Sequence, residues 1–261
     1  MDSLTLTRQG DVLEIELNRP EKLNALNREM VDQLRTVFQD LYRDQSARVV
    51  VLKGAGRSFC AGLDLQQASS SAPGGSVSDR LDRQRALAEV YVAMRRCPQP
   101  VICQVQGAAS GGGFALALAS DIRILSEDAR MNAAFIRIGL SACDMGVSYF
   151  LPRMVGQSLA SEYLLTGRFI DAPRAAQIGL ANRVVPQDQM AHECDAFVED
   201  MLRATPLGLR LTKDGLNLAI DAGGLEAVMA IEDRNQMLTA GDPNFQEGMR
   251  AFLEKRRPNY D

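Results

Sequence analysis

The feature that most constrains the fold is a glycine-rich junction between a strand and a helix in the middle of the chain. Residues 101–105 and 122–125 have the pattern of buried strands, and residues 114–119 between them are all apolar and predict a helix. The glycine triplet 111–113 stands directly before that helix. Because strand, helix and strand follow one another, we expect a parallel pair joined by a right-handed crossover. The apolar run around 107–120 is too short and too rich in glycine to cross a bilayer.

The flanking segments place this junction in a larger α/β unit. Residues 4–7 and 12–17 alternate in polarity around a turn and predict a β-hairpin. A helix is expected after the N-cap Asn27. Residues 49–52 are expected to form a strand buried on both faces, and residues 68–78 a surface loop. Further helices are predicted from near Ser78 and over residues 157–165, 172–178, 187–203, 206–221, 224–240 and 243–256. We therefore expect an α/β core over residues 1–200 and a helical C-terminal region over residues 201–261.

Charge and cysteine content argue against several classes of function. The 261 residues carry a formal net charge of −4, so a surface built for nucleic acid is not expected. Five cysteines without a Cys-x-x-Cys pair and a single histidine, His192, suggest neither a zinc site nor a disulfide framework. The N-terminus lacks the charged start and long apolar run of a secretory signal. These features predict a cytoplasmic protein with no membrane span and no bound metal.

The glycine triplet is suited to binding a ligand oxygen. Amide groups at the start of a helix point outward, and the helix dipole adds partial positive charge there. A tight crossing with room only for glycine would explain the same triplet. Neither the G-x-G-x-x-G spacing nor a P-loop lysine is present. A second loop, residues 58–65, contains Gly62, which lets the backbone approach closely, so one amide from each loop would form an oxyanion hole.

Several further motifs are distinctive in combination. They are residues 18–26 (NRPEKLNAL), 54–65 (GAGRSFCAGLDL), 105–113 (VQGAASGGG), 151–156 (LPRMVG), 165–167 (LTG), 172–185 and 252–256 (FLEKR). With them the chain resembles the crotonase superfamily, the enoyl-CoA hydratases and isomerases, over nearly its whole length. The resemblance implies an α/β crotonase-like spiral of ββα units with a helical C-terminal trimerisation region. It also implies a homotrimer, often paired as a hexamer.

The resemblance further implies an acyl-CoA thioester substrate whose carbonyl oxygen is held by two backbone amides. By position these are the amides of Leu63 and Gly112. Such donors stabilise an enolate, and removal of one typically costs about 2.7–4 kcal/mol of transition-state stabilisation. The residues implied for binding the CoA nucleotide are Lys22, Leu23, Ala25, Ala61, Asp64, Leu65, Phe252 and Lys255, the last two near its adenine or phosphate end. Solvated lysines, a core phenylalanine and a helix-capping Asp64 are the alternative interpretations. Coenzyme A is part of the substrate here, and no separate cofactor is implied.

Hydratases of the superfamily resemble each other in having two glutamates above the thioester, one that activates water and one that protonates the α-carbon. This sequence has neither. Ala115 stands two residues after the glycine triplet and Phe135 four residues before Gly139, and neither side chain moves protons. One carboxylate remains nearby in the sequence. Asp144 lies eight residues before Pro152, where the resemblance to dienoyl-CoA isomerases and ring-opening phenylacetyl-CoA epoxide isomerases implies an active aspartate. The chain is one residue longer than those relatives just before it, and a cap on a helix starting near Met145 is the alternative role.

A single carboxylate can take a proton from one carbon and return it to another, which favours double-bond isomerisation of an enoyl-CoA through a dienolate. Phe135, Met145 and Tyr149 are expected to form an apolar pocket around it, and Cys143 is expected to be a small buried packing residue. Three other readings stay open: a hydratase acting on an unusual enoyl-CoA, another reaction of the superfamily such as dehalogenation or hydrolysis, and a non-catalytic acyl-CoA-binding subunit. The acyl group and the choice between trimer and hexamer are not determined by the sequence.

Overall fold

Two sheets organise the molecule, which the computed structural model describes over residues 3–70 and 76–260. The strands are β1 (Leu4–Gln9), β2 (Val12–Leu17), β3 (Val49–Gly54), β4 (Val101–Val105), β5 (Ala108–Ser110), β6 (Ile122–Ser126), β7 (Arg130–Asn132), β8 (Ile170–Asp171) and β9 (Arg183–Val185). A six-stranded sheet has the order β1-β2-β3-β4-β6-β9, and a three-stranded sheet has the order β5-β7-β8. In the larger sheet only β1 and β2 are antiparallel.

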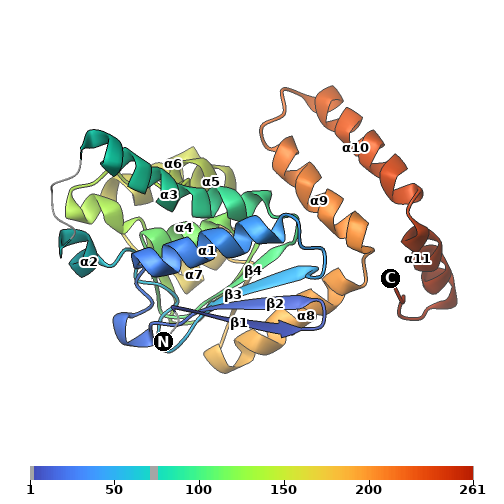
Figure 1. Cartoon of the computed structure of the whole chain (residues 1–261), viewed down its shortest axis with the longest axis horizontal. Helices are drawn as coiled ribbons and strands as arrows, with labels where there is room; N and C mark the ends of the chain where they lie inside the picture. The colour runs from blue at the N-terminus through green and yellow to red at the C-terminus, as the bar shows by residue number, and fades with distance from the viewer. Residues whose placement is uncertain (1–2, 71–75, 261) are drawn as a thin grey trace.

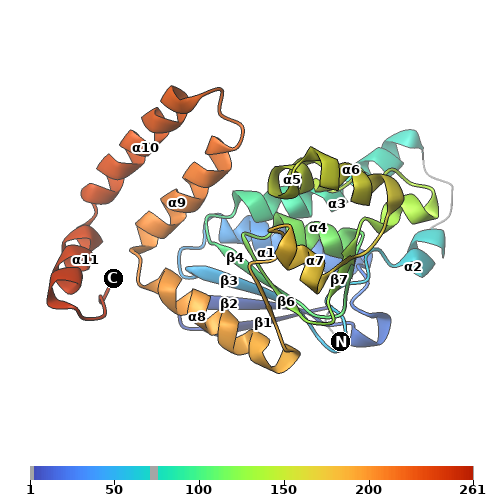
Figure 2. The same cartoon turned by 180° about the vertical axis from the view of Figure 1, so that it is seen from behind.

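Helices cover both faces of the larger sheet (Figures 1 and 2). The α-helices are α1 (Arg28–Leu41), α2 (Leu65–Ser70), α3 (Val77–Arg96), α4 (Gly112–Ala119), α5 (Val147–Val155), α6 (Gln157–Thr166), α7 (Ala172–Gln177), α8 (Met190–Leu202), α9 (Pro206–Ala219), α10 (Leu225–Ala240) and α11 (Pro243–Glu254). Short 3-10 turns are η1 (Pro20–Lys22), η2 (Ala134–Ile138) and η3 (Gln187–Gln189). Strand–strand–helix units recur as β1-β2-α1, β4-β5-α4 and β6-β7-η2.

The alternation of side chains in β3 divides the interior into two cores. Val50 and Leu52 belong to the larger core together with residues of α1, α3 and α4. Val49 and Val51 point to the opposite face, where they pack in a smaller cluster with Met190 of α8. A strand buried on both faces needs an apolar side chain at every position, which explains its unbroken β-branched run.

The start of α1 follows directly from its sequence. The side chain of Asn27 accepts a hydrogen bond from the amide of Met30 at 2.8 Å, which satisfies one of the free donors of the first turn. The buried residues of this helix are Met30, Val31, Leu34, Phe38 and Leu41, which recur at helical spacing. The predicted N-cap and amphipathic helix are therefore confirmed.

Most long elements were predicted and the shortest strands were not. The hairpin, the strands at 49–52, 101–105 and 122–125, and the six helices beyond residue 155 are confirmed. The expected loop 68–78 is shorter at both ends, since α2 continues to Ser70 and α3 starts at Val77 after the N-cap Ser76. Its central residues 71–75 lie outside the described residues.

The last three helices form an arm that projects from the α/β body (Figures 1 and 2). We call residues 206–254 the C-terminal arm. In it α9 and α10 pack against each other, and α11 lies at the far end of the molecule from α2. Its exposed large apolar side chains are Leu216, Leu218, Ile220, Leu225, Met229, Met237, Leu238, Phe245, Met249, Phe252 and Leu253. A surface of this extent and composition is typical of an interface.

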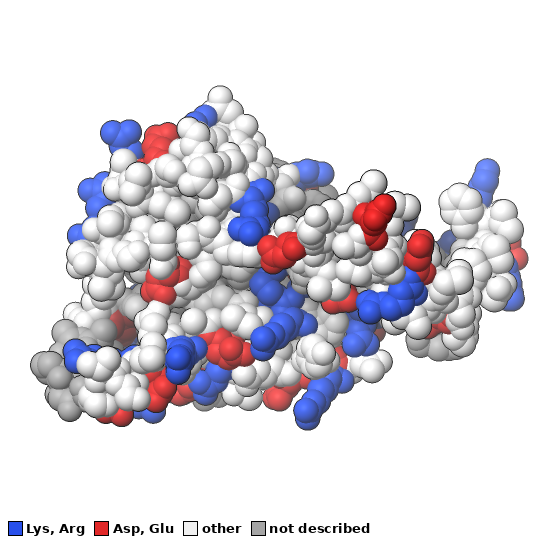
Figure 3. Space-filling model, turned by 90° about the horizontal axis from the view of Figure 1, so that it is seen from above, with Lys and Arg blue, Asp and Glu red and all other residues white. Residues whose placement is uncertain are grey.

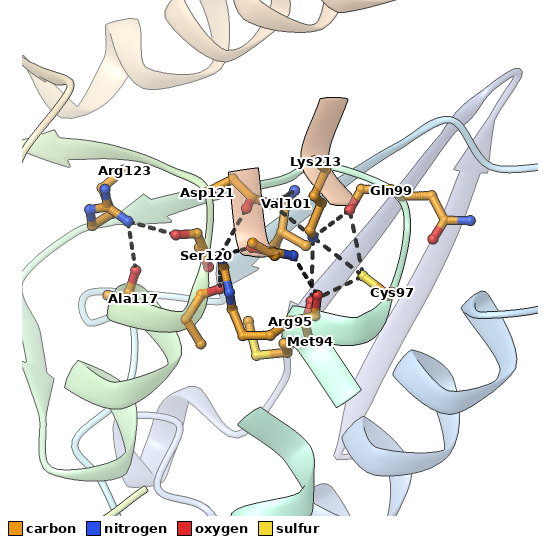
Figure 4. Close-up of polar contacts among 12 residues, drawn as sticks. Met94, Arg95, Cys97, Gln99, Val101, Ala117, Ser120, Asp121, Arg123 and Lys213 are labelled. Carbon is orange, nitrogen blue, oxygen red and sulfur yellow. Dashed lines mark hydrogen bonds and ion pairs between the residues drawn. The ribbon is translucent and has the colours of Figure 1, made fainter. Parts of the chain in front are cut away.

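A buried lysine fastens the arm to the body (Figure 4). The ammonium group of Lys213 on α9 lies 2.9 Å from Asp121 Oδ2 and donates to the Gln99 carbonyl at 2.8 Å, and only 4% of the residue is exposed. Arg95 on α3 pairs with Asp121 Oδ1 at 2.9 Å and also donates to the side chain of Asn217 on α9. The amide of Val101 donates to Asp121 Oδ2 at 2.8 Å. This network joins α3, the α4–β6 turn and α9.

The surface carries charges of both signs. On the face shown in Figure 3, Lys and Arg side chains are interspersed with Asp and Glu across the described residues instead of forming one broad basic patch. Among residues 3–70 and 76–260, no helix is long and apolar enough to span a membrane.

Candidate active site

Three stretches of chain from different parts of the sequence meet at the carboxyl ends of β3 and β4. The amide of Leu26 donates to the Gly62 carbonyl at 2.7 Å, and the amide of Asp64 donates back to the Leu26 carbonyl at 3.0 Å. On its other side the same loop pairs with β5, where Ser110 donates to the Cys60 carbonyl at 3.0 Å. The loop containing Gly62 is thus held between residues 19–26 and β5.

A buried asparagine fixes the first of these stretches. Asn24 is fully buried and has a left-handed backbone with φ of 54°. Its side-chain amide donates to the carbonyls of Ala55 and Ser58, both at 2.8 Å, while its side-chain oxygen accepts from the Arg19 amide at 2.8 Å. Because these bonds satisfy the buried side chain, the motif at residues 18–26 is locked onto the loop that follows β3.

The two predicted oxyanion donors are close together and available. A Cβ placed on Gly62 would lie 3.6 Å from the Gly112 nitrogen and 2.8 Å from the Ser110 carbonyl oxygen, so the two loops touch at this point. Within residues 3–70 and 76–260, neither the Leu63 amide nor the Gly112 amide donates a hydrogen bond to a protein group. Gly112 is also the first residue of α4, where helix amides lack internal partners. That these two amides bind one oxygen stays a prediction.

The alternative explanation of the glycine triplet, a tight crossing with room only for glycine, also holds. Gly111 has φ of 52°, which favours glycine. A Cβ on Gly113 would lie 2.2 Å from the Cys60 carbonyl oxygen, so no larger residue fits there. The close crossing of the two loops therefore occurs where the Gly112 amide, among the described residues, has no protein acceptor.

Asp144 lies near the start of α4, on the segment between η2 and α5. Its neighbour Met145 is close to α4, since the Met145 sulfur lies 3.4 Å from where a Cβ of Gly112 would be. The Tyr91 hydroxyl donates to the Gly112 carbonyl at 3.1 Å. Burial, with smaller effects from nearby Cys60 and Asp144, raises the pKa of Tyr91 well above its ordinary value of 10.0. The extra residue before Asp144 thus leaves it near the start of α4.

Two groups hold the carboxylate of Asp144. The side-chain amide of Gln84 on α3 donates to Oδ1 at 2.6 Å, and the backbone amide of Met145 donates to the same oxygen at 2.8 Å. The alternative role as a helix cap is wrong, because α5 begins at Val147 with Gly146 as its N-cap and has no side-chain cap. The Asp144 residue is half-buried, so its carboxylate is accessible.

The surroundings of Asp144 match the expected apolar pocket only in part. Phe135 is 4% exposed and its ring lies 3.4 Å from a Cβ placed on Gly111, and Met145 is 3% exposed. Tyr149 is different, because its hydroxyl donates to Asp221 Oδ2 at 2.6 Å, at the end of α9. Cys143 is exposed, so its predicted role as a buried packing residue is wrong. Ala115 is completely buried within α4.

Six of the eight residues predicted to bind CoA lie together and two do not. Lys22, Leu23, Ala25, Ala61, Asp64 and Leu65 occupy the two paired loops, where the Ala61 amide donates to the Leu23 carbonyl at 2.9 Å. Phe252 is 83% exposed on α11, and Lys255 follows that helix. Because α11 and α2 lie at opposite ends of the molecule, these two residues are not part of the same site within one chain (Figure 1).

The side chains of this group already have partners. Lys22 donates to Gln66 Oε1 at 3.1 Å. Asp64 accepts from the Gln67 amide at 3.2 Å, as a cap of α2, and pairs with Arg19 at 3.0 Å. Burial alone would raise the pKa of Asp64, but the hydrogen bonds from the Gln67 amide and Arg19 hold it below its ordinary value of 3.8. The structure therefore gives Asp64 its alternative capping role, and its contact with CoA stays a prediction.

Sequence patterns missed two residues of the site, Gln84 and Tyr91. Both belong to α3 and are separated by seven positions, so they share one face of the helix. That spacing was visible in the sequence, but nothing local indicated that this face reaches Asp144, sixty residues further along the chain.

Comparison with known proteins agrees with this geometry. The model of the enoyl-CoA hydratase/isomerase family matches residues 7–261. A probable enoyl-CoA hydratase of Mycobacterium tuberculosis H37Rv is 40% identical over 255 residues, which cover 95% of this chain and 88% of the relative. The 1,2-epoxyphenylacetyl-CoA isomerase of Escherichia coli K12 is 33% identical and the match covers 95% and 94% of the two chains.

The fold is shared with solved structures. A crystal structure of a putative enoyl-CoA hydratase from Streptomyces coelicolor A3(2) aligns with a TM-score of 0.94 at 33% identity, covering 99% of this chain and 94% of that one. A probable enoyl-CoA hydratase/isomerase from Mycobacterium abscessus aligns with a TM-score of 0.89 at 36% identity, covering 98% of each chain. The predicted crotonase-like α/β fold is confirmed.

Proposed function

Since the chain belongs to the enoyl-CoA hydratase/isomerase (crotonase) family, we propose that it isomerises the double bond of an enoyl-CoA and that Asp144 carries the proton. The family implies an acyl-CoA substrate. The observation that carries the proposal is the half-buried carboxylate of Asp144 near the start of α4, where the amides of Leu63 and Gly112 have no protein acceptor among residues 3–70 and 76–260. The presence of a named isomerase among the relatives is consistent with this choice.

In the proposed reaction the thioester oxygen accepts hydrogen bonds from the amides of Leu63 and Gly112. Asp144 removes a proton from the α-carbon of a 3-enoyl thioester, and the electron pair of that C–H bond, conjugated with the carbonyl and the alkene, gives a dienolate. The negative charge collects on the thioester oxygen, where two preorganised donors stabilise it. Asp144 then returns the proton to the γ-carbon, which moves the double bond, restores the carboxylate and leaves a 2-enoyl thioester. No water enters the product.

The replacement of both hydratase glutamates by Ala115 and Phe135 supports isomerisation over hydration. Addition of water needs one group to activate the water and another to protonate carbon, whereas movement of a double bond needs one group that does both in turn. The ring of Phe135, 3.4 Å from a Cβ placed on Gly111, also makes this part of the pocket apolar.

The proposal includes assembly into a trimer or a pair of trimers. The exposed apolar side chains of the C-terminal arm support an intersubunit interface. Phe252 and Lys255 would then reach the CoA of a neighbouring subunit, because α11 lies at the far end of the molecule from α2, where Lys22 binds Gln66 of the same chain. The proposal also keeps the cytoplasmic location expected from the sequence.

The test is solvent-deuterium incorporation at the α- and γ-carbons of a panel of 2-enoyl and 3-enoyl thioesters, measured by mass spectrometry. Wild type is expected to incorporate deuterium and to move the double bond. The variant Asp144→Asn should lose both activities and still bind the thioester.

Two other outcomes would point to the alternative functions. Addition of water without exchange at the γ-carbon would support a hydratase, the activity in the names of most of the relatives. Thioester binding with neither exchange nor hydration would support a non-catalytic acyl-CoA-binding subunit.

A further inference from the structure

Within the part of the chain that the structure describes, one side chain from outside its own loop holds the carboxylate of Asp144. Gln84 lies on α3, sixty residues earlier in the chain, and its Nε2 donates to Asp144 Oδ1 at 2.6 Å. The other donor to this oxygen is the amide of Met145, directly next along the chain. Among residues 3–70 and 76–260, no protein group donates to Oδ2. The two oxygens of this carboxylate are therefore in different environments.

The backbone around Asp144 fixes where the side chain begins but not how its carboxylate is turned. Met145 and Gly146 both have left-handed backbones, with φ of 50° and 81°. The Asp144 carbonyl accepts from the Val147 amide at 2.9 Å, which closes a tight turn into α5. The torsion of a terminal carboxylate is soft, so hydrogen bonds to a particular oxygen decide its orientation.

The helix that carries Gln84 also contacts the start of α4. Tyr91 lies seven residues further along the same face of α3. Its hydroxyl donates to the Gly112 carbonyl at 3.1 Å, and the residue is 2% exposed. α3 therefore contacts both the peptide next to the proposed oxyanion donor and the carboxylate. One rigid helix thus relates the position of the proton carrier to the position of the amides.

We infer that Gln84 is a positioning residue that holds Asp144 Oδ1, so that Oδ2 is the oxygen that exchanges protons with the substrate. This inference rests on the proposed function of Asp144. An amide donor suits the task because it orients a carboxylate without bringing a positive charge, which an arginine or lysine would add.

The structure separates this role from a contribution to stability. Gln84 is exposed, and hydrogen bonds at exposed positions contribute little to folding. A loss of activity after its replacement should therefore appear without a change in melting temperature. Misplacement of a reacting group by about 1 Å lowers the rate by about 100-fold.

The experiment measures α-proton exchange in deuterated buffer with the full-length chain and an enoyl-CoA substrate. Gln84→Ala is expected to lower kcat by about 10–100-fold with a change in KM of less than about twofold. Gln84→Glu keeps the shape of the side chain but cannot donate when ionised, so it should be at least as impaired. Gln84→Arg restores a donor but adds a positive charge beside the carboxylate, so its kcat should stay below that of wild type.

The matched control is Arg85→Ala, on the same exposed turn of α3. Arg85 pairs only loosely with Asp82, at 3.8 Å with both side chains well exposed, so its loss should leave kcat and KM unchanged.

Failure of this inference is distinguishable from failure of the proposed function. If Asp144→Asn abolishes exchange while Gln84→Ala exchanges at the wild-type rate, Asp144 is the proton carrier and the positioning role is wrong. If Asp144→Asn exchanges normally, or if wild type exchanges no protons with any thioester of the panel, both are overturned. A parallel fall in kcat and melting temperature for Gln84→Ala would assign Gln84 a structural role instead.

Discussion

The buried ammonium group of Lys213 is the part of the structure whose removal has the most sharply defined consequence. We consider Lys213→Met, which keeps an unbranched side chain, one atom shorter, and deletes its charge. Three oxygens lose a donor: Asp121 Oδ2 at 2.9 Å, the Gln99 carbonyl at 2.8 Å and the Met94 carbonyl at 3.3 Å. With 4% of Lys213 exposed, water does not replace the missing donor without opening the contact between α9 and the body.

The expected loss follows from the partners that remain. Removal of one member of a buried ion pair typically costs about 3–5 kcal/mol, because the other charge is left without compensation. Asp121 keeps Arg95 at 2.9 Å and the Val101 amide at 2.8 Å, which places the expected cost near the lower end, at about 3 kcal/mol. For a chain of this size, this corresponds to a fall in melting temperature of about 6–12 °C.

Thermal and urea unfolding measure this change, and limited proteolysis locates it. Because the network joins α9 to the body, cleavage in Lys213→Met should begin between α8 and α10. The control is Asp214→Asn on the same helix, which removes an exposed ion pair with Arg234 at 3.9 Å and should cost less than about 1 kcal/mol. In the double variant with Asp121→Asn the two losses should not add, since both changes break the same contact. A Lys213→Met protein as stable as wild type would refute the reasoning.

Two further predictions concern the loop crossing and the buried thiols. Gly113→Ala places a methyl group 2.2 Å from the Cys60 carbonyl oxygen and should destabilise the fold by about 3 kcal/mol in urea unfolding. The control Gly223→Ala, where nothing lies within 4 Å of the added methyl group, should not destabilise it. Equal stability of the two variants would show that the crossing is not tight. Burial raises the pKa of both Cys60 and Cys103 from the ordinary value of 9.0 to about 12, so the folded state retains protons that the unfolded state releases. The contribution of these protonated thiols to stability is complete below about pH 9 and is lost as the pH rises towards 12, by about 1.4 kcal/mol per pH unit for each thiol. Cys103→Ala should therefore make the fall of the unfolding free energy with pH less steep. An unchanged slope contradicts this prediction.

The long elements of the fold were predictable because each contains its own pattern. Asn27 and the spaced apolar residues of α1 define a helix without reference to the rest of the chain, and the β-branched run of β3 defines a strand. The strands β5, β7, β8 and β9 have two or three residues each, too few for any period to be recognised. They exist because neighbouring segments pair with them, which is a property of the tertiary structure.

The candidate site divides in the same way. The loops at residues 18–26 and 58–65 were predictable as partners from their motifs, and the structure brings them together through Leu26 and Gly62. The contact between Gln84 and Asp144 was not predictable, because it depends on how α3 crosses the segment before α5. Exposure was misjudged for the same reason. Cys143 was expected to be buried, yet it is exposed, because what covers a loop residue is decided by the tertiary structure.

The fastening of the arm bears on the proposed assembly. α10 packs chiefly on α9, so the direction in which α9 leaves the body determines where α10 and α11 lie. That direction depends on Lys213 and Asn217, which bind Asp121 and Arg95. If Phe252 and Lys255 complete the CoA site of a neighbouring subunit, loss of this anchor must displace them relative to that neighbour. Lys213→Met should then weaken assembly and thioester affinity together with stability, whereas an arm that only covers the body would lose stability alone.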